Sequence, residues 1–485
     1  MQNENKFAKL GVIYAVGQIL SKLISFILLP IYTKQLGMIG FGQLALVDTV
    51  LDFITSFIMI GVYSGYMRFY RDYEEQKTRL KNTALTFAFF MSILNIILAL
   101  TIGKFVSTLI FSIDNSYYIL VLVVVRSVFS QLVVLLMCDY GLNYKAKINV
   151  TLNVVNLFLN LVFTVLLVMV LKRGIAGIYE SYILSNIILF IYLMIVMDSK
   201  YKFEIDRGML KDMLKFSAGL IPSGIASTVL TLSDRYFLKG YRNVTETGIY
   251  SLGYKFGMLI QPLFVSPFSQ IFTPYKFSIW KDSDAEEKFN VMFLKYHVIG
   301  CFIMLGICIY SKPMIILLST PESVVAYKLV PLIVLSYFLY GKSSFYCLGL
   351  QIKNKTFYDG LIMLSAGIIN IILNIILISK LGMYGAALAT VISYIAMNFI
   401  YLKFSLPLYP VKYKRKNISK IYLITLILYC VYYSVSILHI PILLEMTIGI
   451  VLLFAYIAGS VYFKLISRDE LMRYVEKIKM KMSKR

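Results

Sequence analysis

Long apolar runs alternate with short polar segments along almost the whole chain. Each run has about 20 residues, which is the length that an α-helix needs to cross roughly 30 Å of hydrocarbon. We predict fourteen membrane-spanning helices from these runs. They are expected at residues 10–32, 42–65, 83–102, 117–138, 149–171, 175–197, 216–239, 247–272, 289–311, 323–346, 357–379, 383–403, 418–438 and 441–465.

The pattern inside the runs favours helices over the strands of a membrane barrel. Barrel strands need only about ten residues of alternating polarity, whereas the stretch from Leu161 to Leu171 is apolar on every side. The first run follows Lys6 and Lys9 but continues past Pro30 without a small-residue cleavage site. We therefore expect it to be a retained helix and not a signal peptide. The predicted fold class is all-α, a polytopic membrane protein.

Composition and charge agree with this class and add a topology. Hydrophobic residues make up 59% of the chain, charged residues only 15%, and the mean hydropathy is +0.77, which is outside the range of soluble domains. Of the 48 Lys and Arg residues, 34 fall in the two termini and alternate loops, and 8 fall in the opposite loops. Basic residues concentrate on the cytoplasmic side, so both termini are predicted to be cytoplasmic. The net charge of +23 then reflects topology and contact with anionic lipid, and nucleic acid is not an expected partner.

The chain also repeats itself at a separation of about 208 residues. Three segments of the first half recur in the second, at offsets of 208, 208 and 206. The matched pairs are Gly141–Lys147 with Gly349–Lys355, Gly174–Gly177 with Gly382–Gly385, and Phe41–Leu46 with Thr247–Leu252. Agreement of the offsets indicates duplication of a six-helix unit. Because six is even, the two units would enter the membrane in the same orientation, with a substrate site between them.

The repeat divides the chain into five predicted parts. Two six-helix halves are expected at residues 1–199 and 216–403, joined by a cytoplasmic linker at 200–215. Residues 404–465 would form the two extra helices. Residues 466–485 would form a basic cytoplasmic tail on the anionic inner leaflet.

Six cations lie inside the apolar runs, namely Lys22, Arg126, Arg235, Lys255, Lys295 and Lys328. A cation at membrane depth costs at least about 2.5 to 3.5 kcal/mol, so each must reach an interface, form a pair or line a wet cavity. We expect Lys295 and Lys328, which lie near helix ends, to extend to the interface. Two interpretations stay open for Arg126, a functional role and a structural ion pair with Glu180.

Charged residues gather on the first two helices of each predicted half. This predicted substrate cavity comprises Lys22, Asp48, Asp52, Asp234, Arg235 and Lys255. Asp48 and Asp52 are four residues apart and therefore share a helix face. Cations at this depth can bind an anionic cargo through charge-assisted hydrogen bonds. Ion pairs between helices are an alternative, and so is proton or sodium coupling through Asp48, Asp52 or Glu180.

Two further charges lie near the ends of predicted helices. Arg68 ends the second helix on the cytoplasmic side, where it would anchor the topology or contact a substrate headgroup. Glu445 lies near the outer end of the last helix, and we expect it to be solvated.

Several segments resemble the opening of the Wzx-type polysaccharide flippases, a family of the multidrug/oligosaccharidyl-lipid/polysaccharide (MOP) exporter superfamily. The similar segments are Ser21–Gly37, Phe41–Gln43, the stretch from Gly61 to Tyr70, and Gly248–Leu252. The helix count, the two halves and the extra C-terminal pair extend the resemblance over the whole chain.

The resemblance implies a transporter of the bacterial inner membrane. It would move an undecaprenyl-diphosphate-linked oligosaccharide from the cytoplasmic to the outer leaflet by alternating access. Helices 1, 2, 7 and 8 would line its central cavity, and the extra pair would form a groove for the lipid tail, as in some relatives. A polysaccharide polymerase and glycosyltransferases would be its partners.

Two other functional classes are weighed against a flippase. A membrane polysaccharide polymerase or ligase is expected to carry a long outer loop, whereas the predicted outer loops have fewer than about 20 residues. A drug or cation antiporter would favour twelve helices and an acidic cavity. The scarcity of histidine and the scattered cysteines predict neither a metal site nor disulfides. We expect no catalytic residue and no cofactor, since Gly341-Lys342-Ser343 lacks the earlier glycine of a phosphate-binding loop.

Overall fold

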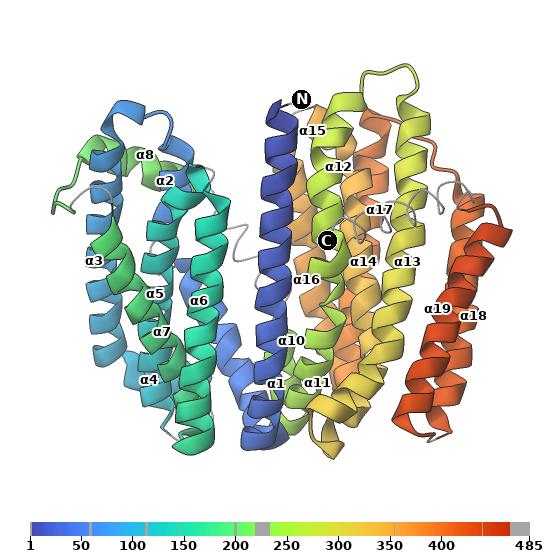
Figure 1. The fold of residues 1–485 in the computed structure, drawn as a ribbon, viewed down its shortest axis with the longest axis horizontal. Coiled ribbons are helices and arrows are strands. Elements are labelled where there is room, and N and C mark those ends of the chain that lie inside the picture. Colours follow the sequence, from blue (N-terminus) through green and yellow to red (C-terminus); the bar gives the residue numbers. More distant parts are fainter. Residues whose placement is uncertain are drawn as a thin grey trace. The chain divides into compact units, whose positions relative to one another are not determined.

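The computed structural model describes the chain in eight segments. These are residues 2–57, 61–111, 115–143, 145–197, 201–218, 233–353, 355–438 and 440–465. In residues 2–16, 18–19 and 21–23 only the backbone is described. All regular structure in these segments is helical (Figure 1), which confirms the all-α class. The chain forms two compact units, and the first comprises Met1–Ser251, Leu318–Thr320 and Ile371–Ala386.

The first unit contains ten labelled helices and one π-helical turn in its main segment. These are α1 (Gln2–Phe57), α2 (Val62–Phe69), α3 (Lys77–Thr101), α4 (Gly103–Ile110), α5 (Ser116–Leu142), α6 (Ala146–Thr164), η2 (Val165–Val170), α7 (Gly174–Val196), α8 (Arg207–Ala218), α10 (Asp234–Tyr241) and the first part of α11 (Val244–Gly257). A 3-10 turn, η1 (Glu74–Gln76), precedes α3.

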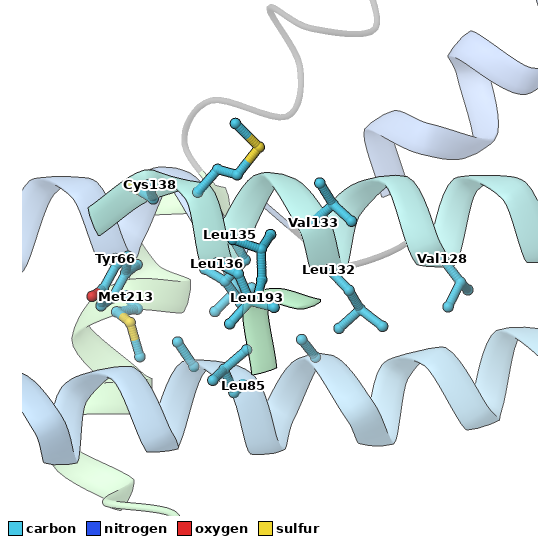
Figure 2. Close-up of a cluster of buried hydrophobic side chains, with 14 of the residues drawn as sticks. Tyr66, Leu85, Val128, Leu132, Val133, Leu135, Leu136, Cys138, Leu193 and Met213 are labelled. Carbon is cyan, nitrogen blue, oxygen red and sulfur yellow. The ribbon is translucent and has the colours of Figure 1, made fainter. Parts of the chain in front are cut away.

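Helices α3, α5, α7 and α8 bury a common cluster of apolar side chains. Figure 2 shows Leu136 and Leu193 together at its centre, Leu85 below them, and Met213 beside Tyr66 at the left; all belong to this cluster. On α3 the small residue Ala84 is fully buried. Small side chains let helix backbones approach closely, and in lipid such van der Waals packing, more than water exclusion, holds helices together.

The second unit contains the later helices and the remainder of α11. They are η3 (Gln261–Val265), α12 (Ser266–Ile279), α13 (Ala285–Leu318), η4 (Pro321–Lys328), α14 (Val330–Tyr346), α15 (Leu348–Ile352), α16 (Thr356–Leu381), α17 (Met383–Phe404), η5 (Leu406–Leu408), α18 (Arg415–Ile437) and α19 (Ile442–Tyr462). The middle of α16 to the start of α17 belongs to the first unit.

In the described residues ten helices are long and apolar enough to cross a membrane. The number rises to eleven if η4 and α14, bent by 43° at their junction, count as one span. A polytopic membrane protein is thereby confirmed, with fewer continuous spans than the fourteen predicted. The differences lie in the first, second, seventh and eighth predicted helices.

Helix α1 consists of two helices that meet at a kink at Gly37. They correspond to the first predicted helix and to the second as far as Phe57, and residues 62–65 belong to α2. Gly37 has φ of 64° and ψ of −178°, a conformation that is essentially restricted to glycine. The length of an apolar run predicts the length of a helix. It does not show whether two successive helices are joined by a loop or by a single kinked residue. The seventh predicted helix includes residues 219–232, which lie outside the described residues.

The eighth predicted helix is divided into shorter pieces. Helix α11 ends at Gly257, and the chain continues through the π-helical η3 into α12. Pro262 and Pro267 stand at the starts of η3 and α12. Proline removes a backbone donor and interrupts the regular ladder, so neither piece reaches the length of a span.

Gly42 of α1 and Gly248 of α11 form a close crossing within the first unit. A Cβ atom added to Gly42 would collide with the carbonyl oxygen of Val244, and one added to Gly248 would collide with that of Met38. Each added Cβ would also lie 3.0 Å from the backbone nitrogen of the other glycine. Backbone meets backbone here, so only glycine fits at either position.

Candidate functional site

Arg126, on α5, is held at membrane depth by groups from two other helices. Its Nη1 lies 3.7 Å from Oδ1 of Asp48 on α1. Its guanidinium lies over the rings of Tyr182, 3.8 Å from the centroid, and Tyr179, 5.2 Å away, both on α7. A carboxylate and two aromatic faces together compensate a cation that has left water.

Asp48 connects this arrangement by a second contact. The hydroxyl of Tyr179 donates a hydrogen bond of 2.9 Å to Oδ1 of Asp48. The Asp48 side chain is 39% exposed and that of Arg126 is 18% exposed. The pair is therefore accessible and not sealed in a core.

Of the two interpretations of Arg126, the ion pair with Glu180 is not formed. Glu180 instead binds Arg173, at the start of α7, with an Nε to Oε2 distance of 2.6 Å, and accepts a hydrogen bond from Tyr118. Adjacent residues on a helix point about 100° apart. When Tyr179 faces Arg126, Glu180 is consequently turned away from it.

A second charged group lies where α10 begins and packs near α11. Asp234 is 2% exposed and Arg235 is 7% exposed, and their Oδ1 and Nη1 atoms are 3.5 Å apart. The hydroxyl of Tyr250 donates to the other carboxylate oxygen of Asp234. Tyr236 donates to the carbonyl of Leu46, 3.3 Å away, and so connects α10 to α1.

Asp52 lies one helical turn after Asp48 and is exposed on α1. Its carboxylate lies within the electrostatic field of Asp48, Arg126 and Arg235. The first unit thus brings together five of the predicted or possible site residues. We call this set the charged network, and its members are Asp48, Asp52, Arg126, Asp234 and Arg235.

The structure does not place the remaining predicted residues in the charged network. The side chain of Lys22 is outside the described residues. Lys255 is half-buried on α11 and belongs to the second unit. Arg68 is half-exposed in the last turn of α2 and pairs with Asp72 at 2.7 Å, as a surface anchor would.

The second unit contains a buried ion pair that sequence reasoning missed. Nζ of Lys312 on α13 lies 2.9 Å from Oε2 of Glu445 on α19, and it donates to the carbonyl of Ser436 at 2.7 Å. Tyr432 donates to the other oxygen of Glu445. Glu445 is only 1% exposed, so the expectation that it is solvated is wrong. Glu445 lies inside an apolar run, and a carboxylate at such a position predicts a buried cationic partner.

The second unit also contains an apolar cavity of about 350 Å³. Its walls come from α13, α14 and α18, the last being one of the extra helices. The lining includes Leu305, Cys308, Leu335, Tyr422 and Leu426. Almost no polar surface faces this space, so it suits a hydrocarbon chain.

Known proteins match both the sequence and the fold. Residues 7–280 match the family described as "Polysaccharide biosynthesis protein". A relative from Haemophilus influenzae, the Lsg locus putative protein 1, is 25% identical over 333 residues, which are 67% of this chain and 77% of the relative.

Two solved structures illustrate the similarity of fold. The lipid II flippase MurJ in its inward closed conformation has a TM-score of 0.73 at 17% identity, covering 93% of this chain and 99% of MurJ. An inward-facing multidrug resistance MATE family transporter of the MOP superfamily has a TM-score of 0.62 at 14% identity, covering 80% of this chain and 95% of the transporter. The chain has the MOP transporter fold.

Proposed function

Because the chain belongs to the polysaccharide biosynthesis protein family, we propose that it is a flippase for an undecaprenyl-diphosphate-linked oligosaccharide. Its fold is that of MOP superfamily transporters, and this places it among transporters and not among enzymes. The cargo would pass from the cytoplasmic to the outer leaflet by alternating access.

The proposal includes fourteen transmembrane helices in two parallel six-helix repeats and an extra pair. The close crossing of α1 and α11 supports the repeat. Val244 follows Met38 by 206 residues, and Gly248 follows Gly42 by the same number. Gly42 lies against the carbonyl oxygen of Val244, and Gly248 lies against that of Met38. A two-fold axis between the halves requires such reciprocity. Gly174 and Gly382, separated by 208 residues, likewise share positive φ values of 58° and 56°.

The environment of Arg126 carries the proposal for the cargo. Its distance of 3.7 Å to Asp48 exceeds the roughly 2.7–2.9 Å of a charge-assisted hydrogen bond. The Arg126 side chain is 18% exposed, and a guanidinium can form two parallel hydrogen bonds with a diphosphate. Asp48 would hold the cation in place while the site is empty. Arg235 is the second arginine of the charged network and could add a positive charge near a bound diphosphate.

The apolar cavity supports the lipid part of the cargo. Its lining by α13, α14 and the extra helix α18 gives a polyprenyl chain an apolar surface within the second unit. Sugar, diphosphate and tail would then be bound by different parts of the chain.

The test replaces the cations of the proposed site one at a time. Arg126→Ala, Arg235→Ala, Lys22→Ala and Lys255→Ala are each expected to lower the amount of lipid-linked glycan at the outer leaflet, by about tenfold or more for Arg126. Glycan exposure is measured on intact cells with a membrane-impermeant lectin or glycosidase, at matched protein levels. Arg71→Ala, at an exposed arginine after α2, is the control. Full transport by all four variants would refute the proposed site.

The fold also suits a drug or cation antiporter, the second candidate, because a MATE transporter shares it and carboxylates are present at membrane depth. Loss of drug resistance on deletion, with normal polysaccharide at the surface, would favour this alternative. We further propose residence in a bacterial inner membrane with both termini cytoplasmic. A polysaccharide polymerase and glycosyltransferases would be the partners.

A further inference from the structure

A polar cavity of about 360 Å³ lies in the first unit, at the ends of α2, α3, α5 and α7. It is separate from the charged network. Asp139 in its wall is thirteen residues from Arg126 along α5, which is about 20 Å at 1.5 Å per residue. The helix ends that form it carry basic loops, which the positive-inside rule assigns to the cytoplasm.

The lining of this cavity is cationic. Lys77, Lys81 and Lys145 face it, and Asp139 is its one carboxylate among the described lining residues. Nζ of Lys81 lies 2.5 Å from Oδ2 of Asp139, and Tyr66 donates to the other oxygen. Both oxygens of Asp139 are thus engaged, and two lysines remain in excess. Lys77 also pairs with Glu74, a side chain 72% exposed, where solvent screens the attraction.

Neutral donors complete the lining. The amide of Asn143 donates to the hydroxyl of Tyr70 at 2.9 Å, which leaves the Tyr70 proton able to donate into the cavity. Lys77 lies over the Tyr70 ring, 4.9 Å from its centroid. Lysines with a hydroxyl donor suit an anion with several acceptor oxygens.

The corresponding corner of the second half is built differently. Asn82 donates to the side chain of Glu204, and Asn290, 208 residues later, donates to the carbonyl of Lys412, so the offset of 208 applies to contacts here. At that offset, Phe289 corresponds to Lys81, and Cys347 corresponds to Asp139.

Aromatic rings fill that corner. The centroid of Phe272 lies 4.2 Å from that of Phe345 and 6.5 Å from that of Phe289. The buried Lys276 completes the packing, with its Nζ 3.4 Å from the carbonyl of Ser344 and 3.9 Å from Sγ of Cys347, so this corner is filled by rings and one satisfied lysine. The polar and charged groups around the cavity in the first half cost desolvation free energy. Helix packing does not require them, so another role must explain them.

We propose that this cavity binds a phosphate group on the cytoplasmic side of the membrane. Its volume lies at the lower end of the roughly 300–1,000 Å³ of small-molecule sites and fits a phosphate with a small polyol attached. Two sources share this chemistry, the headgroup of an anionic phospholipid and a soluble phosphate compound. Binding there would fasten the ends of α2, α3 and α5 together.

The experiment titrates the purified full-length chain in a non-ionic detergent by calorimetry. The ligands are inorganic phosphate, dihexanoyl phosphatidylglycerol and zwitterionic dihexanoyl phosphatidylcholine. The variants are Lys77→Gln, Lys145→Gln and Tyr70→Phe, none of which breaks the pair between Lys81 and Asp139. Lys353→Gln, the exposed counterpart of Lys145 at the offset of 208, is the matched control.

We expect phosphatidylglycerol to bind more tightly than phosphatidylcholine, and each lysine variant to weaken binding about tenfold. Tyr70→Phe removes only the hydroxyl and should weaken binding less than the lysine variants do. A graded loss of this kind indicates lost ligand contacts, whereas misfolding would abolish binding. Inorganic phosphate binding with the same losses identifies a soluble source, and binding of phosphatidylglycerol alone identifies a lipid headgroup. The proposal is overturned if neither inorganic phosphate nor phosphatidylglycerol binds, if phosphatidylcholine binds as tightly as phosphatidylglycerol, or if the lysine variants bind like Lys353→Gln.

Discussion

At the scale of single residues, the chain handles membrane-depth charge by giving each cation a mixed set of partners. Arg126 has one carboxylate and two aromatic rings, and Lys312 has a carboxylate and a backbone carbonyl. The two differ in exposure, since Lys312 and Glu445 are buried while Asp48 is accessible. An accessible pair can exchange partners with a ligand, and a buried one is structural.

Gly42 allows a residue-scale test of the close crossing. Gly42→Ala places a methyl group against the carbonyl oxygen of Val244, and the backbone shift should cost about 1–3 kcal/mol. We expect a lower melting temperature in detergent and reduced transport. Gly248→Ala should behave alike.

Gly367→Ala provides the control for this pair. A Cβ at Gly367, in α16, meets nothing within 4 Å, so the change should be neutral or stabilising by roughly 0.5–1 kcal/mol. Equal melting temperatures for the Gly42 and Gly367 variants would contradict the crossing.

At the scale of helices, charge fastens the extra pair to the rest of its unit. Lys312 on α13 contacts both α18, through Ser436, and α19, through Glu445. One side chain thus connects three helices. Asp206, the residue before α8, likewise connects two helices, because it accepts a hydrogen bond from Met209 of α8 and pairs with Arg79 of α3.

Glu445→Ala should strongly destabilise the second unit. It leaves Lys312 buried without its carboxylate, which costs about 3–5 kcal/mol. The double variant Lys312→Met with Glu445→Leu removes both charges and should recover most of that loss. Thermal unfolding monitored by intrinsic fluorescence measures both. A double variant no more stable than Glu445→Ala would show that the charge is not the cause.

Asp206 should make the docking of α8 dependent on pH. Its carboxylate accepts hydrogen bonds from the backbone of Met209 and Gly208 and lies 3.1 Å from Arg79. The hydrogen bond from Met209 is the main cause that lowers the pKa of Asp206 below its ordinary value of 3.8. A lowered native pKa gives stability that is present above the ordinary pKa and lost as pH falls through the native one.

Replacement of Asp206 tests this cap at neutral pH. Asp206→Ala should cost about 1 kcal/mol and speed trypsin cleavage at Arg207 and Lys211. Asp206→Asn can still cap the helix and should lie between wild type and Asp206→Ala. Equal cleavage rates for all three proteins would argue against the cap.

At the scale of the whole molecule, the pattern of apolar runs was enough to predict the helical membrane class and most helix positions. It could not predict that α1 continues past Gly37, because a conformation of one glycine replaces a loop. It placed Asp48, Asp52 and Arg235 on helices of one predicted cavity, which stays a prediction, and it did not identify Asp48 as the partner of Arg126. Hydropathy records how long a helix is, whereas partner choice depends on its rotation about its own axis.

The predicted topology can be tested with a membrane-impermeant thiol reagent on intact cells. Asn115→Cys and Arg173→Cys, on predicted outer loops, should be labelled. Gln76→Cys and Asn143→Cys should be labelled only after the membrane is opened. The background is a variant without Cys430, the exposed native cysteine among those described. Labelling of Gln76→Cys in intact cells would reverse the orientation.

The reciprocal contact of Gly42 and Gly248 limits how far the two halves can diverge. Under the proposed repeat, side chains at corresponding positions can differ, as Lys81 and Phe289 do at one corner. The contact is made by backbone atoms. A larger residue at one glycine therefore cannot be compensated by a smaller side chain at the other. Both positions therefore require glycine, and under the proposed repeat this crossing is the place where the two halves can differ least.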